Sequence, residues 1–283
     1  MRKITRQSLL YKTRVEYGDW TINHVLGCKH GCHYPCYAFM MAKRFGWVKN
    51  YSDWRKPRIV KNAMQLLEKE IRQYKNQINF VHLCFMTDPF MYDSKLKNLV
   101  PEIKNLTMDI IKKLNEHDIK VTTLTKGFYP EEILKQQHLL NKDNEYGITL
   151  VSLDNKFQDT YEPHSAPHEE RISSLKKLAD AGLKTWVSME PYPTPNIVKQ
   201  DLSRILDKIS FVNKIIFGKM NYNVKSSSFE DRKGFYQNRA DEITSFCEIN
   251  GMKLHIKYGT EKENNKHTQK IFRERENIDA IKI

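Results

Sequence analysis

The feature that most constrains the fold is an alternation of short apolar segments with longer amphipathic ones. The apolar segments have the length and the β-branched and aromatic content of strands, whereas the segments between them space their apolar residues as helices do. The seven predicted strands span residues 20–26, 80–85, 120–124, 146–153, 184–189, 214–217 and 253–256. The predicted helices span residues 38–47, 58–74, 99–117, 130–140, 168–181, 196–209 and 239–250. Strict alternation of this kind predicts an α/β fold in which βα units surround a parallel sheet.

No linker, repeat or low-complexity stretch interrupts the alternation. We therefore expect residues 1–260 to form one domain and residues 261–283 to form a short C-terminal extension, a charged tail that is helical or loose. A chain of 283 residues can bury a full core without disulfides. No apolar run approaches the ~18 residues of a membrane span, and no signal-peptide segment follows Met1. With five irregularly spaced cysteines, the chain is predicted to be cytoplasmic and not membrane-bound.

The charge balance is strongly basic, with 47 Lys and Arg against 34 Asp and Glu and a formal net charge of +13. A charge of this size raises the encounter rate with polyanions. Lysines recur on almost every predicted helix, which is also typical of a lysine-rich proteome. We expect nucleic acid or another phosphate-bearing molecule as a partner.

Three of the five cysteines, Cys28, Cys32 and Cys36, lie in one loop, GCKHGCHYPCYAFM, after the first predicted strand. In a reducing compartment, clustered cysteines are metal ligands or redox groups more often than disulfides. A structural zinc site needs a fourth ligand, which His30 or His33 could supply, but such sites usually pair two short knuckles and this sequence has one. Three thiolates in one loop suit an iron–sulfur cluster in which one iron has no protein ligand.

Polar residues follow six of the predicted strands at their carboxyl ends, where barrels of βα units carry their chemistry. The cysteine loop follows the first strand, and at the ends of the next five lie Thr87, Asp88, Thr125, Lys126, Ser152, Asp154, Ser188, Glu190, Lys219 and Asn221. Packing alone does not explain polar residues at so many strand ends. The two remaining cysteines, Cys84 and Cys247, stand singly in apolar segments, and we expect both in the core.

The cysteine loop and four later stretches resemble the radical SAM superfamily, most closely its spore photoproduct lyase-like branch, often labelled DNA repair photolyases. The later stretches are MTDPF, VTTLTKG, TYEPHSAPHEERISSLKKLADAGLKTWVSMEP and KIIFGKMNYN. The resemblance implies a partial (β/α)6 barrel of the TIM type and a [4Fe-4S] cluster held by Cys28, Cys32 and Cys36. It also implies that S-adenosylmethionine binds the open iron and is cleaved to a 5′-deoxyadenosyl radical. An electron donor such as flavodoxin or ferredoxin would be a partner.

One departure from the family is the spacing of the cysteines, which is C-x3-C-x3-C here and usually C-x3-C-x2-C. Pro35 is the inserted residue, because its removal restores Cys-His-Tyr-Cys-Tyr-Ala. A proline can stiffen a bulge and leave the thiolates convergent, or the insertion could change how one cysteine ligates the cluster.

The resemblance assigns several residues near the cysteines to the cofactor. Tyr34 and Tyr37 match aromatics that border the cluster and the adenine, or else they only pack the loop. Thr87 and Asp88 match the strand end that receives the methionyl amino group, although Asp88 could instead form an Asx turn with the following proline. Lys126 matches a lysine that faces the carboxylate of S-adenosylmethionine, and its alternative is a snorkelling surface lysine.

Two further cofactor positions come from the later stretches. Ser152 matches a polar residue that contacts S-adenosylmethionine, or it caps a turn. Arg171, which follows Glu162 in the EP…ER stretch, touches the S-adenosylmethionine carboxylate or pairs with an acid on its own helix. For Glu190, an ion pair with a barrel lysine is the alternative to a substrate contact. Four residues are expected to face the same opening and contact the substrate: Ser188, Glu190, Lys219 and Asn221.

The predicted function is hydrogen abstraction from a nucleic acid or nucleotide-like substrate, because the lyase-like resemblance and the positive charge agree. Two alternatives stay open: a radical enzyme that acts on a peptide or a metabolite, and a non-catalytic, zinc-stabilised nucleic-acid-binding protein. The sequence does not indicate whether S-adenosylmethionine is consumed or regenerated.

The lyases of this branch hold a hydrogen-donating cysteine in the second strand, three residues before the aspartate that here is Asp88. This chain has Phe85 at that position, and Cys84 lies one residue earlier. Because side chains alternate across a strand, Cys84 is predicted to point away from the barrel interior. We therefore expect that this chain does not repair spore photoproduct.

Overall fold

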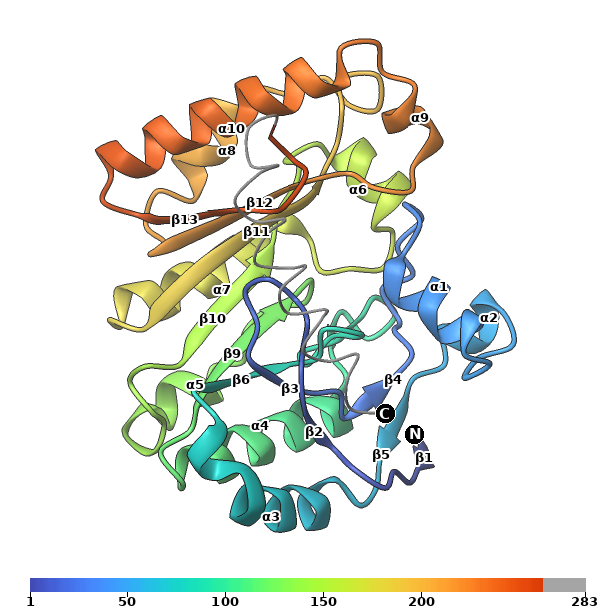
Figure 1. Cartoon of the computed structure of the whole chain (residues 1–283), viewed down its shortest axis with the longest axis vertical. Helices are drawn as coiled ribbons and strands as arrows, with labels where there is room; N and C mark the ends of the chain where they lie inside the picture. The colour runs from blue at the N-terminus through green and yellow to red at the C-terminus, as the bar shows by residue number, and fades with distance from the viewer. Residues whose placement is uncertain (262–283) are drawn as a thin grey trace, which may run out of the picture.

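The computed structural model describes residues 1–261 and is built on one eight-stranded sheet (Figure 1). Seven of its strands are parallel: β3 (Trp20–Ile22), β6 (Phe80–Leu83), β9 (Lys120–Thr125), β10 (Glu145–Thr149), β11 (Lys184–Tyr192), β12 (Lys214–Lys219) and β13 (Lys253–Ile256). These strands follow one another across the sheet in chain order, and β2 (Leu10–Lys12) is added antiparallel to β3 at the edge. Because β2 and β13 form separate edges, the sheet is a partial barrel, which confirms the predicted α/β fold class.

Helices cover the outer face of the curved sheet (Figure 1). They are α3 (Ala63–Tyr74), α4 (Pro101–Asn115), α5 (Glu132–Lys135), α7 (His168–Asp180), α8 (Leu202–Lys208) and α10 (Arg232–Ile249). Each turns apolar residues toward the sheet; α4, for example, begins with a proline and buries Ile103, Ile111 and Leu114. One continuous apolar core lies between the helices and the strands.

Smaller elements lie around the open side of the main sheet (Figure 1). A three-stranded sheet contains β1 (Arg2–Ile4), β5 (Arg58–Val60) and β4 (Val25–Leu26), and β7 (Tyr92–Asp93) pairs with β8 (Asn98–Leu99). The remaining helical segments are α1 (Tyr37–Arg44), α2 (Tyr51–Trp54), η1 (Lys75–Gln77), η2 (Gln137–Leu139), α6 (Asn155–Tyr161) and α9 (Val224–Ser227). Among these, α1 directly follows the cysteine loop.

The structure corrects several predicted boundaries. Residues 58–60 form β5 and not the start of a helix, because they pair with β1 and β4, which lie far away in the sequence. The first predicted strand is divided between β3 and β4, and the fourth ends at Thr149 and not at residue 153. Two helices begin at other residues than predicted because an aspartate caps each of them. Asp201 caps α8, which begins at residue 202 and not at 196, and Asp231 caps α10, which begins at residue 232 and not at 239. Residues 130–140 contain only α5 and η2.

The N-terminal segment is tied to the domain by a buried carboxylate. Glu70 on α3 accepts hydrogen bonds from the backbone N–H of Leu9, at 3.0 and 3.1 Å, and of Leu10, at 2.7 Å. The loop between β2 and β3 then crosses to the other edge of the sheet. There Glu16 accepts hydrogen bonds from His255 Nε2 at 3.1 Å and from the backbone N–H of Tyr258 at 3.0 Å. Side chains thus bridge the two edges that the backbone leaves apart.

Within residues 1–261, no helix is both long and apolar enough to cross a membrane. The prediction of a charged tail falls almost entirely on residues 262–283, which lie outside the described residues. That residues 1–260 form a single domain stays a prediction.

We predict that Glu70→Ala lowers the free energy of unfolding by roughly 2–4 kcal/mol, because two buried N–H groups lose their charged acceptor. Equilibrium denaturation in urea measures the change. Glu68→Ala is the matched control on the same helix: Glu68 is exposed and, within residues 1–261, pairs with Arg72 alone, so its loss should cost less than about 0.5 kcal/mol. Equal effects of the two substitutions would contradict the anchoring role of Glu70.

Candidate active site

A cavity of about 840 Å³ lies at the carboxyl ends of the parallel strands. Its walls come from the cysteine loop and from the ends of β6, β9, β10, β11, β12 and β13. The predicted residues that line it are Cys28, Cys32, Tyr34, Cys36, Tyr37, Thr87, Asp88, Lys126, Ser188, Glu190, Lys219 and Asn221. The fold therefore brings together residues that are spread over more than half of the sequence.

The cysteine loop takes its shape from glycine. Gly27 has φ of +91°, and a Cβ atom there would lie 2.5 Å from the carbonyl oxygen of Trp54. This close approach lets the backbone N–H of Cys28 donate to the same oxygen at 2.9 Å. The cysteines of the loop are free thiols and partly buried. Burial raises the pKa of Cys28 well above its usual value and that of Cys32 to about 12, so neutral thiols are favoured before any metal binds.

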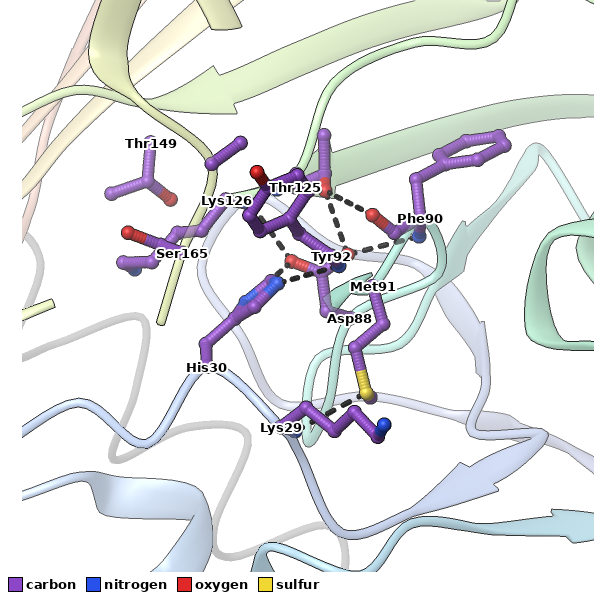
Figure 2. A network of polar contacts seen from close by, with 12 residues as sticks. Lys29, His30, Asp88, Phe90, Met91, Tyr92, Thr125, Lys126, Thr149 and Ser165 are labelled. Carbon is purple, nitrogen blue, oxygen red and sulfur yellow. Dashed lines mark hydrogen bonds and ion pairs between the residues drawn. The ribbon is translucent and has the colours of Figure 1, made fainter. Parts of the chain in front are cut away.

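Behind the cysteines lies a buried network centred on Asp88 (Figure 2). The Nε2 atom of His30 accepts a hydrogen bond from the backbone N–H of Tyr92 at 2.8 Å, so its proton is on Nδ1, 3.4 Å from Asp88 Oδ2. Asp88 also accepts hydrogen bonds from Thr125 Oγ1 and from the backbone N–H of Lys126, both at 2.7 Å. The network therefore connects the cysteine loop with the ends of β6 and β9.

Asp88 forms the Asx turn that was its alternative prediction, and its role toward a cofactor stays a prediction. Its Oδ1 atom accepts a hydrogen bond from the backbone N–H of Phe90 at 2.9 Å, which is the Asx turn across Pro89. It also lines the cavity, as does Thr87, whose hydroxyl donates to the carbonyl oxygen of Val25 at 3.3 Å. Burial raises the pKa of Asp88, although its hydrogen bonds act in the opposite direction.

The donor set of this site favours a cluster over zinc. Both ring nitrogens of His30 are engaged, by Tyr92 and Asp88. His33 is exposed, and its Nδ1 atom donates to the carbonyl oxygen of Thr160 at 3.0 Å. His30 therefore has no free ring nitrogen for a metal, and His33 does not line the cavity that the cysteines line. In residues 1–261, no group of three or more His, Cys, Asp or Glu side chains is arranged to hold a single metal ion. Three cysteines on one cavity wall fit a cluster that leaves one iron open.

Lys126 belongs to a second polar group at the cavity wall. Its ammonium lies 3.9 Å from Glu162 Oε1 and 5.6 Å from the centroid of the Tyr34 ring. The Tyr34 hydroxyl donates to the same carboxylate at 2.8 Å, and Arg171 pairs with its other oxygen at 2.8 Å. Burial favours a raised pKa for Glu162, but Arg171 and Lys126 outweigh it and hold that pKa below its usual value.

Two predicted cofactor residues do not line the cavity. Arg171 is fully buried and donates to the carbonyl oxygens of Ala166 and Thr149. The alternative prediction placed the acid that pairs with Arg171 on the same helix. The acid is instead Glu162, which lies at the end of α6. Ser152 is buried three residues beyond the end of β10, and its hydroxyl accepts a hydrogen bond from Asp154 N–H at 3.1 Å. Thr149, at the strand end itself, lines the cavity in its place.

The half of the cavity farther along the sheet carries the predicted substrate residues. Ser188 is buried, and Glu190 pairs with Lys257 at 3.0 Å, which is the ion pair with a barrel lysine that the sequence left open. The ammonium of Lys219 donates to the carbonyl oxygen of Gly259. Burial, with the cations of Arg232 and Lys233 nearby, lowers the pKa of Lys219.

The prediction that Cys84 points away from the barrel interior is wrong, because Cys84 and Phe85 both line the cavity. The strand β6 ends at Leu83, and Cys84 has φ of +67°. Side chains alternate only in extended backbone, so the rule does not apply beyond the strand end. The expectation that this chain does not repair spore photoproduct loses the argument on which it was based.

The thiol of Cys84 begins a buried hydrogen-bond chain. Thr107 donates to the carbonyl oxygen of Pro89 at 2.7 Å and accepts from His24 Nε2 at 2.7 Å. The Nδ1 atom of His24 is therefore an acceptor, and Cys84 Sγ lies 3.5 Å from it. Burial raises the pKa of Cys84 to about 12 and lowers that of His24 to about 3, so both groups are neutral.

Sequence reasoning missed several residues that line the cavity, and of these Lys257 and Tyr258 directly follow a strand. The missed residues are Tyr11, Glu16, Tyr17, Phe45, Trp47, His82, Lys257 and Tyr258. Those of the β2–β3 loop and the end of α1 carry no strand-end signal. For the residues at the end of α1, the sequence signal is the pair of aromatic residues within the charged turn KRFGWVK.

The family model of the radical SAM superfamily matches residues 22–209. The chain therefore belongs to the radical SAM superfamily, a family of enzymes whose cofactors are an iron–sulfur cluster and S-adenosylmethionine. The matched residues include the cysteine loop and the parallel strands from β6 to β11.

Two curated relatives are similar in sequence. The uncharacterized protein MJ0683 of Methanocaldococcus jannaschii is 27% identical over 191 residues, which is 67% of this chain and 66% of the relative. The uncharacterized protein ORF301 of Acidianus two-tailed virus is 25% identical over 201 residues, 67% of this chain and 61% of the relative. The chain thus matches just under two thirds of the length of each relative.

Two solved structures share the fold. Spore photoproduct lyase complexed with dinucleoside spore photoproduct aligns with a TM-score of 0.61 at 16% identity, over 90% of this chain and 80% of the lyase. Streptococcus suis SuiB bound to the precursor peptide SuiA aligns with a TM-score of 0.56 at 16% identity, over 84% of this chain and 48% of SuiB. At these identities, the likeness establishes the fold and leaves the substrate open.

We predict that Glu162→Gln destabilises the protein by about 3 kcal/mol at neutral pH, because Arg171 is left as an unpaired buried charge. The folded pKa of Glu162 lies below its ordinary value of 4.5, so the carboxylate contributes stability above that value and loses it as the pH falls through the folded pKa. The difference between wild type and variant should therefore shrink in acid. Urea denaturation across pH measures it, with the exposed Glu131→Gln as the control. A difference that stays constant with pH would contradict this role.

Proposed function

We propose that this chain is a radical SAM enzyme in which Cys28, Cys32 and Cys36 hold a [4Fe-4S] cluster and S-adenosylmethionine binds at the remaining iron. The observation that carries the proposal is that these thiols line one cavity, whereas His30 has both ring nitrogens engaged and His33 does not line that cavity. When bound, the cluster supplies the electron that cleaves S-adenosylmethionine to methionine and a 5′-deoxyadenosyl radical. The protein contributes position, charge and the exclusion of water.

The residues of the cluster half would hold S-adenosylmethionine by charge and by ring contact. Lys126 presents an ammonium at the cavity wall, which suits the carboxylate of the methionyl group. Thr87 offers a hydroxyl oxygen that suits its amino group, and Asp88, whose oxygens are already hydrogen-bonded, adds negative charge beside it. Tyr37 lines the cavity with an exposed ring, which suits the adenine, whereas the ring of Tyr34 is buried beneath Lys126.

Arg171 and Ser152 would act from outside the cavity. Arg171 neutralises Glu162, so that the carboxylate can hold Tyr34 and Lys126 in place. Ser152 stabilises the turn after β10. Their contribution to cofactor binding is therefore one of positioning.

The proposed substrate is a nucleic acid or a nucleotide-like molecule. In support, the far half of the cavity combines Lys219 and Lys257 with aromatic side chains, and the whole chain has a net charge of +13. Ser188, Glu190 and Asn221 add hydrogen-bonding groups for orientation. A dinucleoside occupies a structure of similar fold. A second candidate is a peptide, because a precursor peptide occupies another structure of similar fold.

The proposal extends to the setting of the enzyme. We infer one domain formed by residues 1–260, a cytoplasmic location, and an electron donor such as flavodoxin or ferredoxin. The test of the whole proposal is anaerobic incubation with dithionite and S-adenosylmethionine, followed by a screen of DNA, RNA, nucleotides and peptides. Formation of 5′-deoxyadenosine supports the enzyme, and the compound that stimulates it identifies the substrate class. Colourless protein with stoichiometric zinc would instead indicate the zinc-stabilised binding protein.

We predict that replacing Cys28, Cys32 or Cys36 with Ala abolishes the reconstituted cluster and the formation of 5′-deoxyadenosine, because each thiolate is a ligand. Iron and sulfide content, with the visible absorption of anaerobic protein, measures the cluster. Cys247→Ala is the control, since Cys247 is buried in the core away from the cavity, and Cys84→Ala should also keep the cluster. Full cluster content in Cys36→Ala would exclude a three-thiolate site with the extended spacing.

We predict that Lys126→Ala weakens the binding of S-adenosylmethionine by roughly 1–3 kcal/mol, the range for a charge-assisted contact, and leaves the cluster content intact. Equilibrium dialysis of the anaerobic protein with radiolabelled S-adenosylmethionine measures the affinity. Lys104→Ala is the matched control, because Lys104 pairs with Glu132 and does not line the cavity. An unchanged affinity in Lys126→Ala would remove Lys126 from the cofactor site.

A further inference from the structure

The helix α1, which begins directly after Cys36, ends in an aromatic pair at the cavity wall. Phe45 and Trp47 are 55% and 46% exposed, and both line the cavity that the cysteines line. Their rings are stacked, with centroids 5.2 Å apart and planes inclined by 30°. Large aromatic side chains usually bury most of their surface, so a stacked pair left open at a cavity is a surface suited to a ligand ring.

The backbone fixes this pair in place. Gly46 has φ of +70°, its N–H donates to the carbonyl oxygen of Lys43 at 3.0 Å, and the N–H of Trp47 donates to that of Ala42 at 2.9 Å. This is the Schellman arrangement of a helix end, which needs glycine at the left-handed position. A Cβ atom on Gly46 would meet nothing within 4 Å, so the requirement there is conformational and not one of space.

The turn is also anchored to the cysteine loop. The residues on either side of it, Ala42 and Val48, are buried together with Trp54. Cys28 and Cys36 pack against the same cluster. A surface held in this way loses little conformational freedom when a ligand binds. Its position relative to the cysteines is set by the same packing.

Charge around the pair points to a polyanion. Lys43 and Arg44 precede the aromatics and Lys49 follows them, and all three are exposed. Within residues 1–261, none of these three side chains forms an ion pair. Tyr222 and Tyr258, beyond the ends of β12 and β13, line the same cavity and are partly exposed. Stacked aromatics interleaved with cations are the features by which proteins hold single-stranded nucleic acids.

We propose that Phe45 and Trp47 form a stacking platform for a base of a single-stranded nucleic acid, next to the nucleotide that enters the cavity. Lys43 and Arg44 would contact the phosphates on either side of that base. The inference deepens the proposed function by adding a second contact to its substrate. It rests on the proposed function for the nucleotide that reacts, whereas the stacking platform itself does not depend on it. An acidic protein is the competing partner, but it would meet the outer surface, whereas this pair lines the cavity itself.

Tryptophan fluorescence provides a direct test. Trp47 is exposed, whereas Trp20, Trp54 and Trp186 are 4%, 2% and 1% exposed, so Trp47 alone can stack on an added base. We expect an oligothymidylate of about a dozen nucleotides, within the usual site sizes, to quench the emission of the reconstituted protein saturably. In Trp47→Phe the quenching should disappear, while the affinity measured by anisotropy of a labelled oligonucleotide stays similar.

Affinity measurements test the platform further. Replacing Phe45 and Trp47 together with Ala should weaken oligonucleotide binding by roughly 5- to 150-fold, the range for loss of base stacking. Removing Lys43 and Arg44 should lower the salt dependence of binding. The matched controls lie outside the cavity: the exposed apolar residues Leu139 and Ile249, and the exposed cations Arg204 and Lys208 on α8, all replaced with Ala.

Four outcomes separate the platform from the proposed enzyme, and the first three would overturn the platform. Binding that is unchanged in the double aromatic variant would mean that the strand lies elsewhere. Equal quenching by polyglutamate would assign the surface to an acidic protein. Reductive cleavage of S-adenosylmethionine without any oligonucleotide binding would overturn the platform and leave the proposed enzyme intact. Quenching by the oligonucleotide in a protein that does not cleave S-adenosylmethionine would support the platform and overturn the enzyme.

Discussion

The buried carboxylate of Asp88 is the interaction on which the rest of the site depends. An ionised group in an apolar interior is stable only when hydrogen bonds replace its lost hydration. The donors here come from three places in the chain: the imidazole of His30, the hydroxyl of Thr125 and the backbone N–H of Lys126. Because these groups must converge to satisfy one carboxylate, the cysteine loop and two strand ends are held in a single arrangement.

Much of the fold could be predicted because its main signal is local. Each parallel strand is a short apolar segment, and each is followed by a segment with helical spacing, so the order across the sheet follows the order in the chain. The segments that were misread depend on distant partners. Residues 58–60 read as helix from their neighbours, but they are a strand because residues 2–4 and 25–26 lie beside them. Nothing within the segment itself carries that information.

The candidate site was predictable to the extent that it follows the strand ends. Lys126 directly follows β9 and Glu190 lies near the end of β11, and both line the cavity. Cys28 also lines it, although it follows β4 of the three-stranded sheet. The prediction of site residues from strand ends failed where a strand ends before the apolar segment of the sequence does. Ser152 lies beyond the true end of β10, and Cys84 lies beyond the end of β6 in a left-handed conformation that turns its thiol to the cavity. Strand ends are set by pairing, which the sequence pattern locates only approximately.

The two halves of the cavity differ in a way that separates chemistry from recognition. Around the cysteines, His30, Tyr34 and Arg171 are buried and have hydrogen-bond or ion-pair partners, so this side of the cavity is held in one arrangement. Across the cavity, the described residues join the sheet edges through a side chain: Glu16 of the β2–β3 loop accepts hydrogen bonds from His255 and from the backbone N–H of Tyr258. Edges joined in this way, and not by backbone pairing, can change in sequence without disturbing the barrel. Buried contacts therefore fix the half of the cavity that contains the cysteines, whereas the β2–β3 loop and the end of α1 can vary in sequence without disturbing it.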